Sequence, residues 1–273
     1  MQRPKKSLGQ NFLQDSNVSQ KIVRLFDPQP SDAVVEIGPG KGALTALLTA
    51  ILPHLTVIEL DNHLIGELQT QFGEKISIIH SDILKVDISA LAPAPDAKIR
   101  LIGNIPYNIT TPILFHVIDH AAHVKDFVVM MQTEVAQRLT AKPRTKEYGI
   151  LSIFLQYYCA PKILFSVSKN SFFPIPAVSS TVVHLNFDEP FAPKALNDAL
   201  FRKIVRGTFN TRRKTLRNGL RNVGVPHEEF EKLHLNLEMR PEELSVADFV
   251  QLSNDLNHCS SLILGTETET IDG

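Results

Sequence analysis

The sequence has little of what marks several protein classes. It contains only two cysteines, Cys159 and Cys259, and no CxxC pair, which argues against a disulfide framework or a cysteine-ligated zinc site. Its 13 glycines and 17 prolines among 273 residues exclude a fibrous or low-complexity chain. No apolar run reaches the ~18 residues of a membrane-spanning helix, and no apolar signal core follows the basic N-terminal residues. We therefore expect a globular cytoplasmic protein with no membrane partner.

Charge is distributed unevenly along the chain. The formal net charge is only −1, yet residues 200–227 contain eight basic residues and no acidic one. Residues 1–14 add three basic residues, again without an acid. An acidic chain with two purely basic segments favours a defined surface for a polyanion such as nucleic acid. A solvated helix face is the alternative interpretation.

Hydrophobic patterning predicts an α/β domain followed by a small helical domain. From residue 33 to about 132, short β-branched runs alternate with amphipathic stretches, as in a parallel sheet with crossover helices. The expected strands are residues 33–37, 56–59, 76–80, 99–102, 127–131, 163–167 and 181–187, and the expected helices are residues 43–52, 62–72, 112–122 and 149–158. A boundary near Glu189 would separate domains 1–188 and 189–258, and a disordered tail is expected at 259–273.

A glycine-rich loop, residues 36–42 (EIGPGKG), follows the first expected strand and precedes the first expected helix. Its glycines let the backbone approach a ligand closely, and the helix behind it offers free N–H groups. The spacing loosely satisfies the dinucleotide fingerprint, so a nicotinamide-dependent oxidoreductase stays open. Glu36 argues against that enzyme, because a carboxylate at this place would repel a pyrophosphate but suits a cationic ligand.

Carboxylates follow the next two expected strands. Glu59 lies 21 residues after Gly38, at the spacing where a carboxylate accepts both hydroxyl hydrogens of a ribose. Asp82 follows the third strand. Each could be an ordinary strand-end or helix-capping acid. The carboxyl ends of parallel strands meet at one crevice, so the acids and the glycine loop together indicate an adenosine pocket.

A third motif, residues 103–108 (GNIPYN), follows the fourth expected strand. The Asn104 side-chain carbonyl and the neighbouring backbone carbonyl can accept both hydrogens of an exocyclic amine, and the Tyr107 ring can stack on a base. Pro106 fixes the turn so that these groups point the same way. A plain Asn-x-Pro turn is the alternative.

These motifs resemble a known family. The glycine loop and residues 104–107 (NIPY) are like motifs of class I S-adenosylmethionine-dependent amino-methyltransferases. Residues 7–13 (SLGQNFL), 172–176 (FFPIP) and 209–217 (FNTRRKTLR) look like the ribosomal RNA adenine dimethyltransferase family in particular. The likeness runs from about residue 5 to residue 255. It implies a Rossmann-like class I S-adenosylmethionine-dependent methyltransferase domain with a small all-helical C-terminal domain.

The resemblance also implies a role for each matching residue. S-adenosylmethionine would be bound by Asn11, Leu13, Gly38, Gly40, Glu59, Asp82, Ile83 and Asn104. The target adenine would be held by Asn104, Ile105, Pro106, Tyr107 and Phe173, with the two aromatic rings on its two faces. RNA would be contacted by Arg202, Arg206, Arg212, Arg213, Lys214, Arg217 and Arg221. No metal is expected, because methyl transfer from a sulfonium needs no Lewis acid.

The closest likeness is to the bacterial small-subunit branch of the family, which dimethylates two adjacent adenosines in the 3′-terminal hairpin of 16S rRNA. The expected partner is thus 16S rRNA within a precursor of the small ribosomal subunit, bound by a monomer. Two alternatives stay open, a large-subunit rRNA adenine methyltransferase and an assembly factor whose main role is to bind the small subunit. The nicotinamide-dependent oxidoreductase ranks third.

Overall fold

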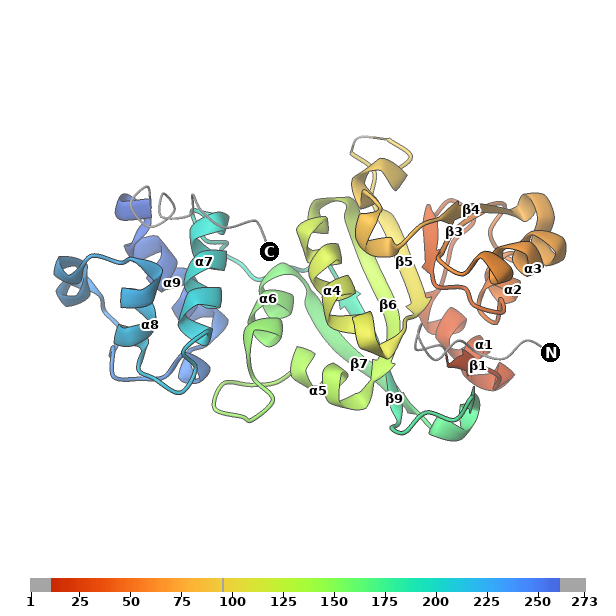
Figure 1. Ribbon diagram of the computed structural model, residues 1–273. Helices are drawn as coiled ribbons and strands as arrows, with labels where there is room; N and C mark the ends of the chain where they lie inside the picture. The colour runs from red at the N-terminus through yellow and green to blue at the C-terminus, as the bar shows by residue number, and fades with distance from the viewer. Residues whose placement is uncertain (1–10, 95, 261–273) are drawn as a thin grey trace. The chain divides into compact units, whose positions relative to one another are not determined.

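The computed structural model describes residues 11–94 and 96–260 (Figure 1). Its strands are β1 (Phe12–Leu13), β2 (Val34–Ile37), β3 (Leu55–Glu59), β4 (Ile76–His80), β5 (Ile99–Asn104), β6 (Val124–Gln132), β7 (Ala160–Val167), β8 (Phe172–Phe173) and β9 (Ser180–Asn186). Its α-helices are α1 (Ser16–Phe26), α2 (Thr45–Leu48), α3 (Asn62–Phe72), α4 (Thr110–Asp119), α5 (Thr133–Leu139), α6 (Ile150–Tyr158), α7 (Asp198–Phe209), α8 (Leu216–Val223) and α9 (Val246–Asp255). In this part of the chain no helix combines the length and the apolar character needed to cross a bilayer.

The described chain divides into two units. Unit 1 consists of residues 11–94, 96–137 and 158–190, and unit 2 of residues 138–157 and 191–260. The break at residue 190 lies next to the expected boundary, but most of α6 belongs to unit 2 and not to the first domain. The reason is packing, because the rings of Phe154 and Tyr157 lie 6.1 and 4.0 Å from the ring of Phe201 on α7. The functional division into two domains stays a prediction, and residues 261–273 of the expected tail lie outside the described residues.

Unit 1 is built around a seven-stranded sheet with the order β4-β3-β2-β5-β6-β9-β7. The first five strands in this order are parallel, and β9 is antiparallel to both neighbours. All four residues of β2 are buried, as expected for a strand that is covered on both faces. The predicted α/β fold with a parallel sheet is confirmed, whereas the short antiparallel pair of β1 and β8 was not expected.

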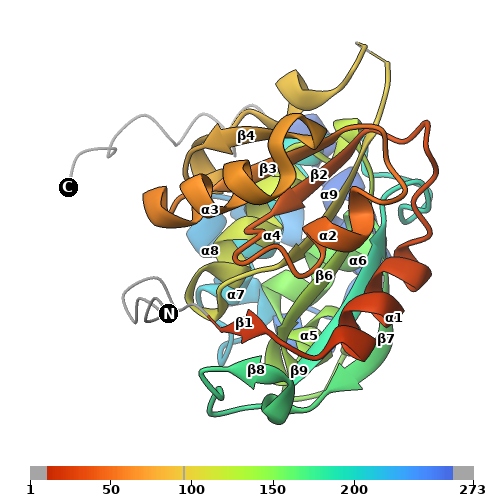
Figure 2. The same ribbon diagram turned by 90° about the vertical axis from the view of Figure 1, so that its right-hand side faces the viewer.

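Helices cover both faces of this sheet, with α1 and α2 on one side and α4 on the other (Figure 2). Phe26 of α1, Leu48 of α2 and Leu68 of α3 share one apolar core with strand residues such as Val128. The expected helix at 43–52 is wrong in length, because only Thr45–Leu48 is helical. The residue before it offers no capping side chain, and the Thr49 hydroxyl bonds back to the carbonyl of Thr45 at 2.9 Å, so turns replace the helix ends.

Arg100 anchors the beginning of β5, the strand whose far end carries Asn104. Its guanidinium donates to both carboxylate oxygens of Asp126, each at 2.8 Å, to Asp32 at 2.7 Å and to the carbonyl of Phe26 at 2.6 Å. Burial opposes ionisation of Asp126, but hydrogen bonds, first among them those from Arg100, hold its pKa below the usual value. One side chain thus joins α1, β5 and β6.

We predict that Arg100→Met lowers the free energy of unfolding by about 3 to 5 kcal/mol, because it removes the guanidinium from the buried carboxylate of Asp126, which then keeps only the weaker contact with His184 at 3.0 Å among its two side-chain partners. Urea unfolding at neutral pH measures the change. The double variant Arg100→Met/Asp126→Asn should recover part of the loss. A single variant as stable as the parent would contradict the anchoring role.

Candidate functional site

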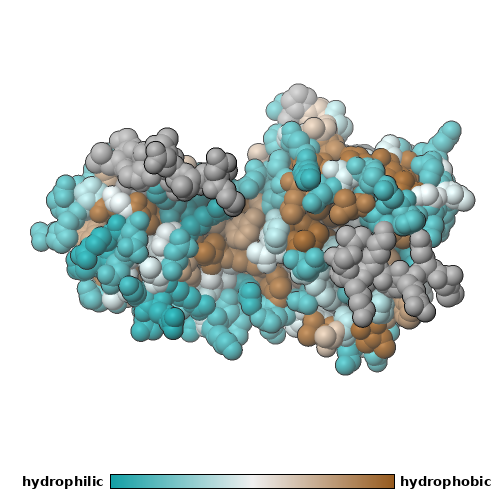
Figure 3. All heavy atoms as spheres, viewed as in Figure 1, coloured by the Kyte–Doolittle hydropathy of each residue, from teal (hydrophilic) through white to brown (hydrophobic). Residues whose placement is uncertain are grey.

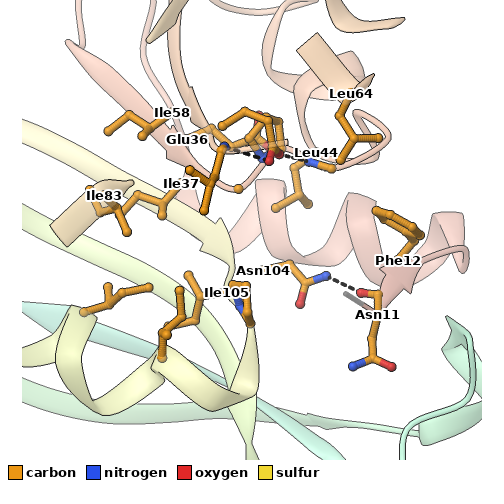
Figure 4. Close-up of a pocket in the computed structure, with 18 of the residues that line it drawn as sticks. Asn11, Phe12, Glu36, Ile37, Leu44, Ile58, Leu64, Ile83, Asn104 and Ile105 are labelled. Carbon is orange, nitrogen blue, oxygen red and sulfur yellow. Dashed lines mark hydrogen bonds between the residues drawn. The ribbon is translucent and has the colours of Figure 1, made fainter. Parts of the chain in front are cut away.

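A pocket lies in unit 1 at the carboxyl ends of β2, β3 and β5 (Figure 4). Every residue expected to bind the cofactor lines it: Asn11, Leu13, Gly38, Gly40, Glu59, Asp82, Ile83 and Asn104. Three further residues of the 103–108 motif, Ile105, Pro106 and Tyr107, line it as well. The structure therefore brings five separate sequence segments to one cavity.

The glycine loop needs its glycines for two different reasons. Gly38 and Gly40 have φ angles of 67° and 57°, a left-handed conformation that side chains rarely adopt. A Cβ atom on Gly40 would also stand 3.1 Å from the ring of Phe12. Phe12, on β1, lines the pocket too, although it is not among the predicted site residues. The N-terminal segment, residues 11–13, thus packs directly on the glycine loop through Phe12.

Glu59 ties the end of β3 to the glycine loop. One carboxylate oxygen accepts the N–H groups of Leu60 at 2.9 Å and Asp61 at 2.8 Å, and the other accepts the N–H of Gly40 at 3.3 Å. Burial raises the pKa of Glu59, and these hydrogen bonds oppose the rise. An ionised carboxylate has about four acceptor sites, so Glu59 retains capacity for a hydroxyl donor from the pocket.

Glu36 connects the beginning of the glycine loop to α2. It is only 1% exposed and accepts a hydrogen bond from the Thr45 hydroxyl of α2 at 2.7 Å. Burial, with a smaller contribution from the charge of Glu59, raises the pKa of Glu36 to about 8. The carboxyl group of Glu36 therefore holds a proton at neutral pH in the folded protein.

Asn104 is held in one orientation by the N-terminal segment. Its amide nitrogen Nδ2 donates to the backbone carbonyl of Asn11 at 3.1 Å, and Figure 4 shows its oxygen pointing away from that contact. The next residue, Ile105, is almost completely buried. The Tyr107 hydroxyl lies 2.6 Å from the hydroxyl of Ser180, a residue that the sequence did not single out.

Phe173 does not line the pocket. It lies on β8, directly opposite Phe12 in the β1–β8 pair, and the residue is 51% exposed. Ile175 and Val178 nearby are exposed as well, and brown apolar patches appear in this part of unit 1 (Figure 3). The contact between Phe173 and a base stays a prediction.

The apolar wall of the pocket is not among the features predicted from the sequence. Ile37, Leu44, Ile58, Leu64 and Ile113 all line it. For two of them the sequence carries a signal, because Ile37 and Ile58 are the last apolar residues before Gly38 and Glu59. A wall of branched aliphatic side chains suits a flat, weakly polar ring.

The predicted RNA-binding residues lie in unit 2 and fall into two groups. Arg202, Arg212 and Arg217 form ion pairs with Asp198, Glu242 and Glu238 respectively. Arg213, Lys214 and Arg221 are exposed and form no ion pair with any residue that the structure describes, and Arg206 is exposed as well. Because the three arginines of the first group are ion-paired within unit 2, their positive charge is partly neutralised and attracts an external polyanion less strongly.

No three His, Cys, Asp or Glu side chains within residues 11–94 and 96–260 are arranged to hold a metal ion. His116 and His120 share helical spacing, but each contacts a backbone carbonyl. Nε2 of His116 lies 2.9 Å from the carbonyl oxygen of Val86, and Nδ1 of His120 lies 2.9 Å from the carbonyl oxygen of His116.

Known proteins resemble the chain over most of its length. The profile of the family described as "Ribosomal RNA adenine dimethylase" matches residues 1–258. The chain is 45% identical over 254 residues to "Ribosomal RNA small subunit methyltransferase A" of Alcanivorax borkumensis, which covers 92% of this chain and 90% of that protein. The protein of the same name from Xanthomonas oryzae pv. oryzae is 46% identical over 252 residues, 92% of this chain and 95% of that protein.

Two solved structures share the fold. A dimethyladenosine transferase from Plasmodium falciparum has a TM-score of 0.75 at 24% identity, covering 91% of this chain and 98% of that one. The 23S rRNA methyltransferase ErmE has a TM-score of 0.65 at 22% identity, covering 90% and 100%. At these identities the two structures support the fold alone.

The raised pKa of Glu36 predicts a pH-dependent stability. Between pH 4.5 and about 8 the folded chain holds a proton on Glu36 that the unfolded chain releases, so this group makes the fold less stable as pH rises. Glu36→Gln should therefore gain stability relative to the parent by up to about 1.4 kcal/mol per pH unit across this window. Urea unfolding at several pH values measures the difference, and a difference independent of pH would refute the prediction.

Proposed function

Because the chain belongs to the ribosomal RNA adenine dimethylase family, we propose that it transfers methyl groups from S-adenosylmethionine to two adjacent adenosines in the 3′-terminal hairpin of 16S rRNA. The observation that carries this proposal is the position of Asn104 at the wall of a pocket that also contains Glu59. The relatives' names specify the small subunit, which favours small-subunit over large-subunit rRNA. The partner would be a precursor of the small ribosomal subunit.

The pocket suits the adenosine and the methionine parts of the cofactor. Glu59 would accept the ribose hydroxyls with its remaining lone pairs, and Ile58 and Ile83 would flank the adenine ring. Gly38 and Gly40 would allow the methionine part to approach the backbone, since neither has a Cβ. When bound, S-adenosylmethionine supplies an electrophilic methyl group on a sulfonium that leaves as a neutral thioether.

Asn104 and Ile105 would make the target amine nucleophilic. The lone pair of an adenine amine is delocalised into the ring, so it attacks poorly. If Oδ1 of Asn104 and the backbone carbonyl of Ile105 accept both amine hydrogens, they favour the pyramidal amine and stabilise the positive charge that develops on it. The methylated amine is acidic and loses its proton to solvent, so the reaction requires no strong base. Tyr107 and Phe173 would stack on the two faces of the flipped base.

A methyl-transfer assay tests the proposal. The purified chain is incubated with labelled S-adenosylmethionine and unmethylated small subunits, with large subunits, or with naked 16S rRNA, and the nucleosides are analysed by mass spectrometry. We expect two dimethyladenosines in the 16S hairpin. Methylation of large-subunit rRNA instead would establish the first alternative. Stoichiometric binding to small subunits without methylation would establish an assembly factor.

Asn104→Ala should lower the single-turnover methylation rate by about 100-fold or more, because one of the two carbonyls that stabilise the amine is lost. RNA binding should change little. Asn186→Ala, on β9 opposite Asp126 near the amino end of β6 and outside the pocket, serves as the control and should keep the parent rate. An Asn104→Ala variant with normal turnover would overturn the mechanism.

Glu59→Ala should weaken S-adenosylmethionine binding by about 1.5 to 3 kcal/mol, the range for hydrogen bonds to a charged group. Titration calorimetry provides the measurement. Glu67→Ala removes an exposed carboxylate from α3, outside the pocket, and should leave the affinity unchanged. Equal affinity in the Glu59 variant would remove this residue from the site.

The basic residues of unit 2 predict a salt-dependent affinity for RNA. Each phosphate contact that is lost should reduce the log–log slope of affinity against salt by about 0.7 to 0.9. We expect this reduction of the slope from the triple variant Arg213→Ala/Lys214→Ala/Arg221→Ala, whose altered side chains are exposed. Alanine substitutions of the ion-paired Arg212 and Arg217 should change the slope less. The triple variant Lys75→Ala/Lys125→Ala/Lys162→Ala alters three exposed lysines of unit 1 near the amino ends of β4, β6 and β7 and provides the control. Equal slopes in both triple variants would identify the basic segment as a solvated face.

A further inference from the structure

We propose that Ser180 is a positioning residue for methyl transfer, because its hydroxyl holds the ring of Tyr107 in the orientation that stacks on the target adenine. The inference rests on the proposed function and adds a residue to it. Ser180 neither lines the pocket nor belongs to the 103–108 motif. It acts through Tyr107.

Tyr107 has little local support of its own. It begins a 3₁₀ turn of three residues, Tyr107–Ile109, that has no side-chain cap. The residue is partly exposed, and its hydroxyl lies 2.6 Å from Oγ of Ser180, the distance of a good O–H···O hydrogen bond. Burial raises the pKa of the Tyr107 hydroxyl, which therefore stays protonated and able to donate. This bond restrains the outer end of the ring.

Ser180 lies on a buried strand of unit 1 that is paired on both sides. It is 0% exposed and begins β9, which lies between β6 and β7 in the sheet. In register it pairs with Gln132 on one side and with Val167 on the other. Because its strand is paired on both sides, the Ser180 hydroxyl is well placed to restrain the side chain of Tyr107 on its short turn.

Ser180 also follows directly on the segment that carries Phe173, the second aromatic residue proposed to contact the base. Residues 174–179 connect Phe173 with Ser180, and at the other end β8 is held by its pairing with β1 and by a 2.8 Å bond from the N–H of Gln14 to the carbonyl of Ser171. The segment that bears Phe173 is therefore fixed at both ends, and one of these ends also holds Tyr107. Ser180 thereby sets the position of one aromatic face relative to the other.

The chemistry depends on this position. The Tyr107 ring determines how the stacked base is rotated, and so where its amine lies relative to Oδ1 of Asn104. A displacement of about 1 Å at a reacting group can cost about 100-fold in rate. Losing the restraint should therefore slow the chemical step more than it weakens RNA binding.

The first test compares Ser180→Ala, Tyr107→Phe and the double variant in single-turnover methylation of small subunits. We expect each single variant to lower the rate about tenfold, as for one lost hydrogen bond that orients a reacting group, with KM for the subunits changed less than about twofold. The double variant should be no slower than Ser180→Ala, because both changes remove the same bond and the double variant leaves no buried hydroxyl unpaired. Additive losses in the double variant would overturn the inference.

Thr181→Val is the matched control for stability. The neighbouring Thr181 is also buried, and its hydroxyl lies 3.0 Å from that of Thr133, a residue outside the 103–108 motif. It should lower the melting temperature about as much as Ser180→Ala while leaving the methylation rate at the parent value. Equal losses of rate in the Thr181 and Ser180 variants would show a merely structural role and overturn the inference.

A second readout does not depend on turnover. In hairpin RNA carrying 2-aminopurine at the target position, with S-adenosylhomocysteine present, the parent should quench the fluorescence by stacking, and Ser180→Ala should quench it less. Unchanged quenching and an unchanged rate in Ser180→Ala, with an active parent, would overturn this inference alone. A parent that does not methylate the adenosines would overturn the proposed function as well.

Discussion

The parallel register of β2, β3 and β5 is the constraint on which the site depends. Ile37 is opposite Ile58 on one side and Gly103 on the other, so three strands end at the same level of the sheet. The residues that follow these positions are Gly38, Glu59 and Asn104, a backbone cradle, a carboxylate and an amide. Because β2 and β5 approach closely, a Cβ on Gly103 would stand 2.6 Å from the carbonyl of Ile37. The strand ends that carry the candidate site are therefore also the place where β2 and β5 pack closely.

The N-terminal segment joins these strand ends to the rest of the site. The carbonyl of Asn11 orients the Asn104 amide, and the ring of Phe12 covers Gly40. In the β1–β8 pair, Phe12 also lies opposite Phe173. Two adjacent residues therefore contact the glycine loop, the 103–108 motif and the strand that carries the second aromatic ring. This arrangement connects the side of the pocket suited to the cofactor with the side suited to the base.

The strands and the strand-end residues could be predicted because their signals are local. A β-branched run followed by glycine, acid or asparagine is visible within about ten residues of sequence, and the crevice rule then places Glu59 and Asn104 together. The bonds from Asn104 to Asn11 and from Tyr107 to Ser180 span 93 and 73 residues, and no local pattern indicates them. The assignment of α6 to unit 2 depends on its packing against Phe201, which also lies outside the local sequence of α6. The pairing of Arg212 with Glu242 is likewise invisible in a segment that contains no acid of its own.

The central claim is that one pocket presents an adenine amine to Asn104 beside a bound S-adenosylmethionine. A crystal structure of the chain with S-adenosylhomocysteine and a hairpin RNA containing the two adenosines would test it most directly. The account predicts the ribose on Glu59, the sulfur facing Asn104, and a flipped adenine whose amine donates to Oδ1 of Asn104 and to the carbonyl of Ile105. A cofactor bound elsewhere, or an adenine whose amine makes neither contact, would contradict it.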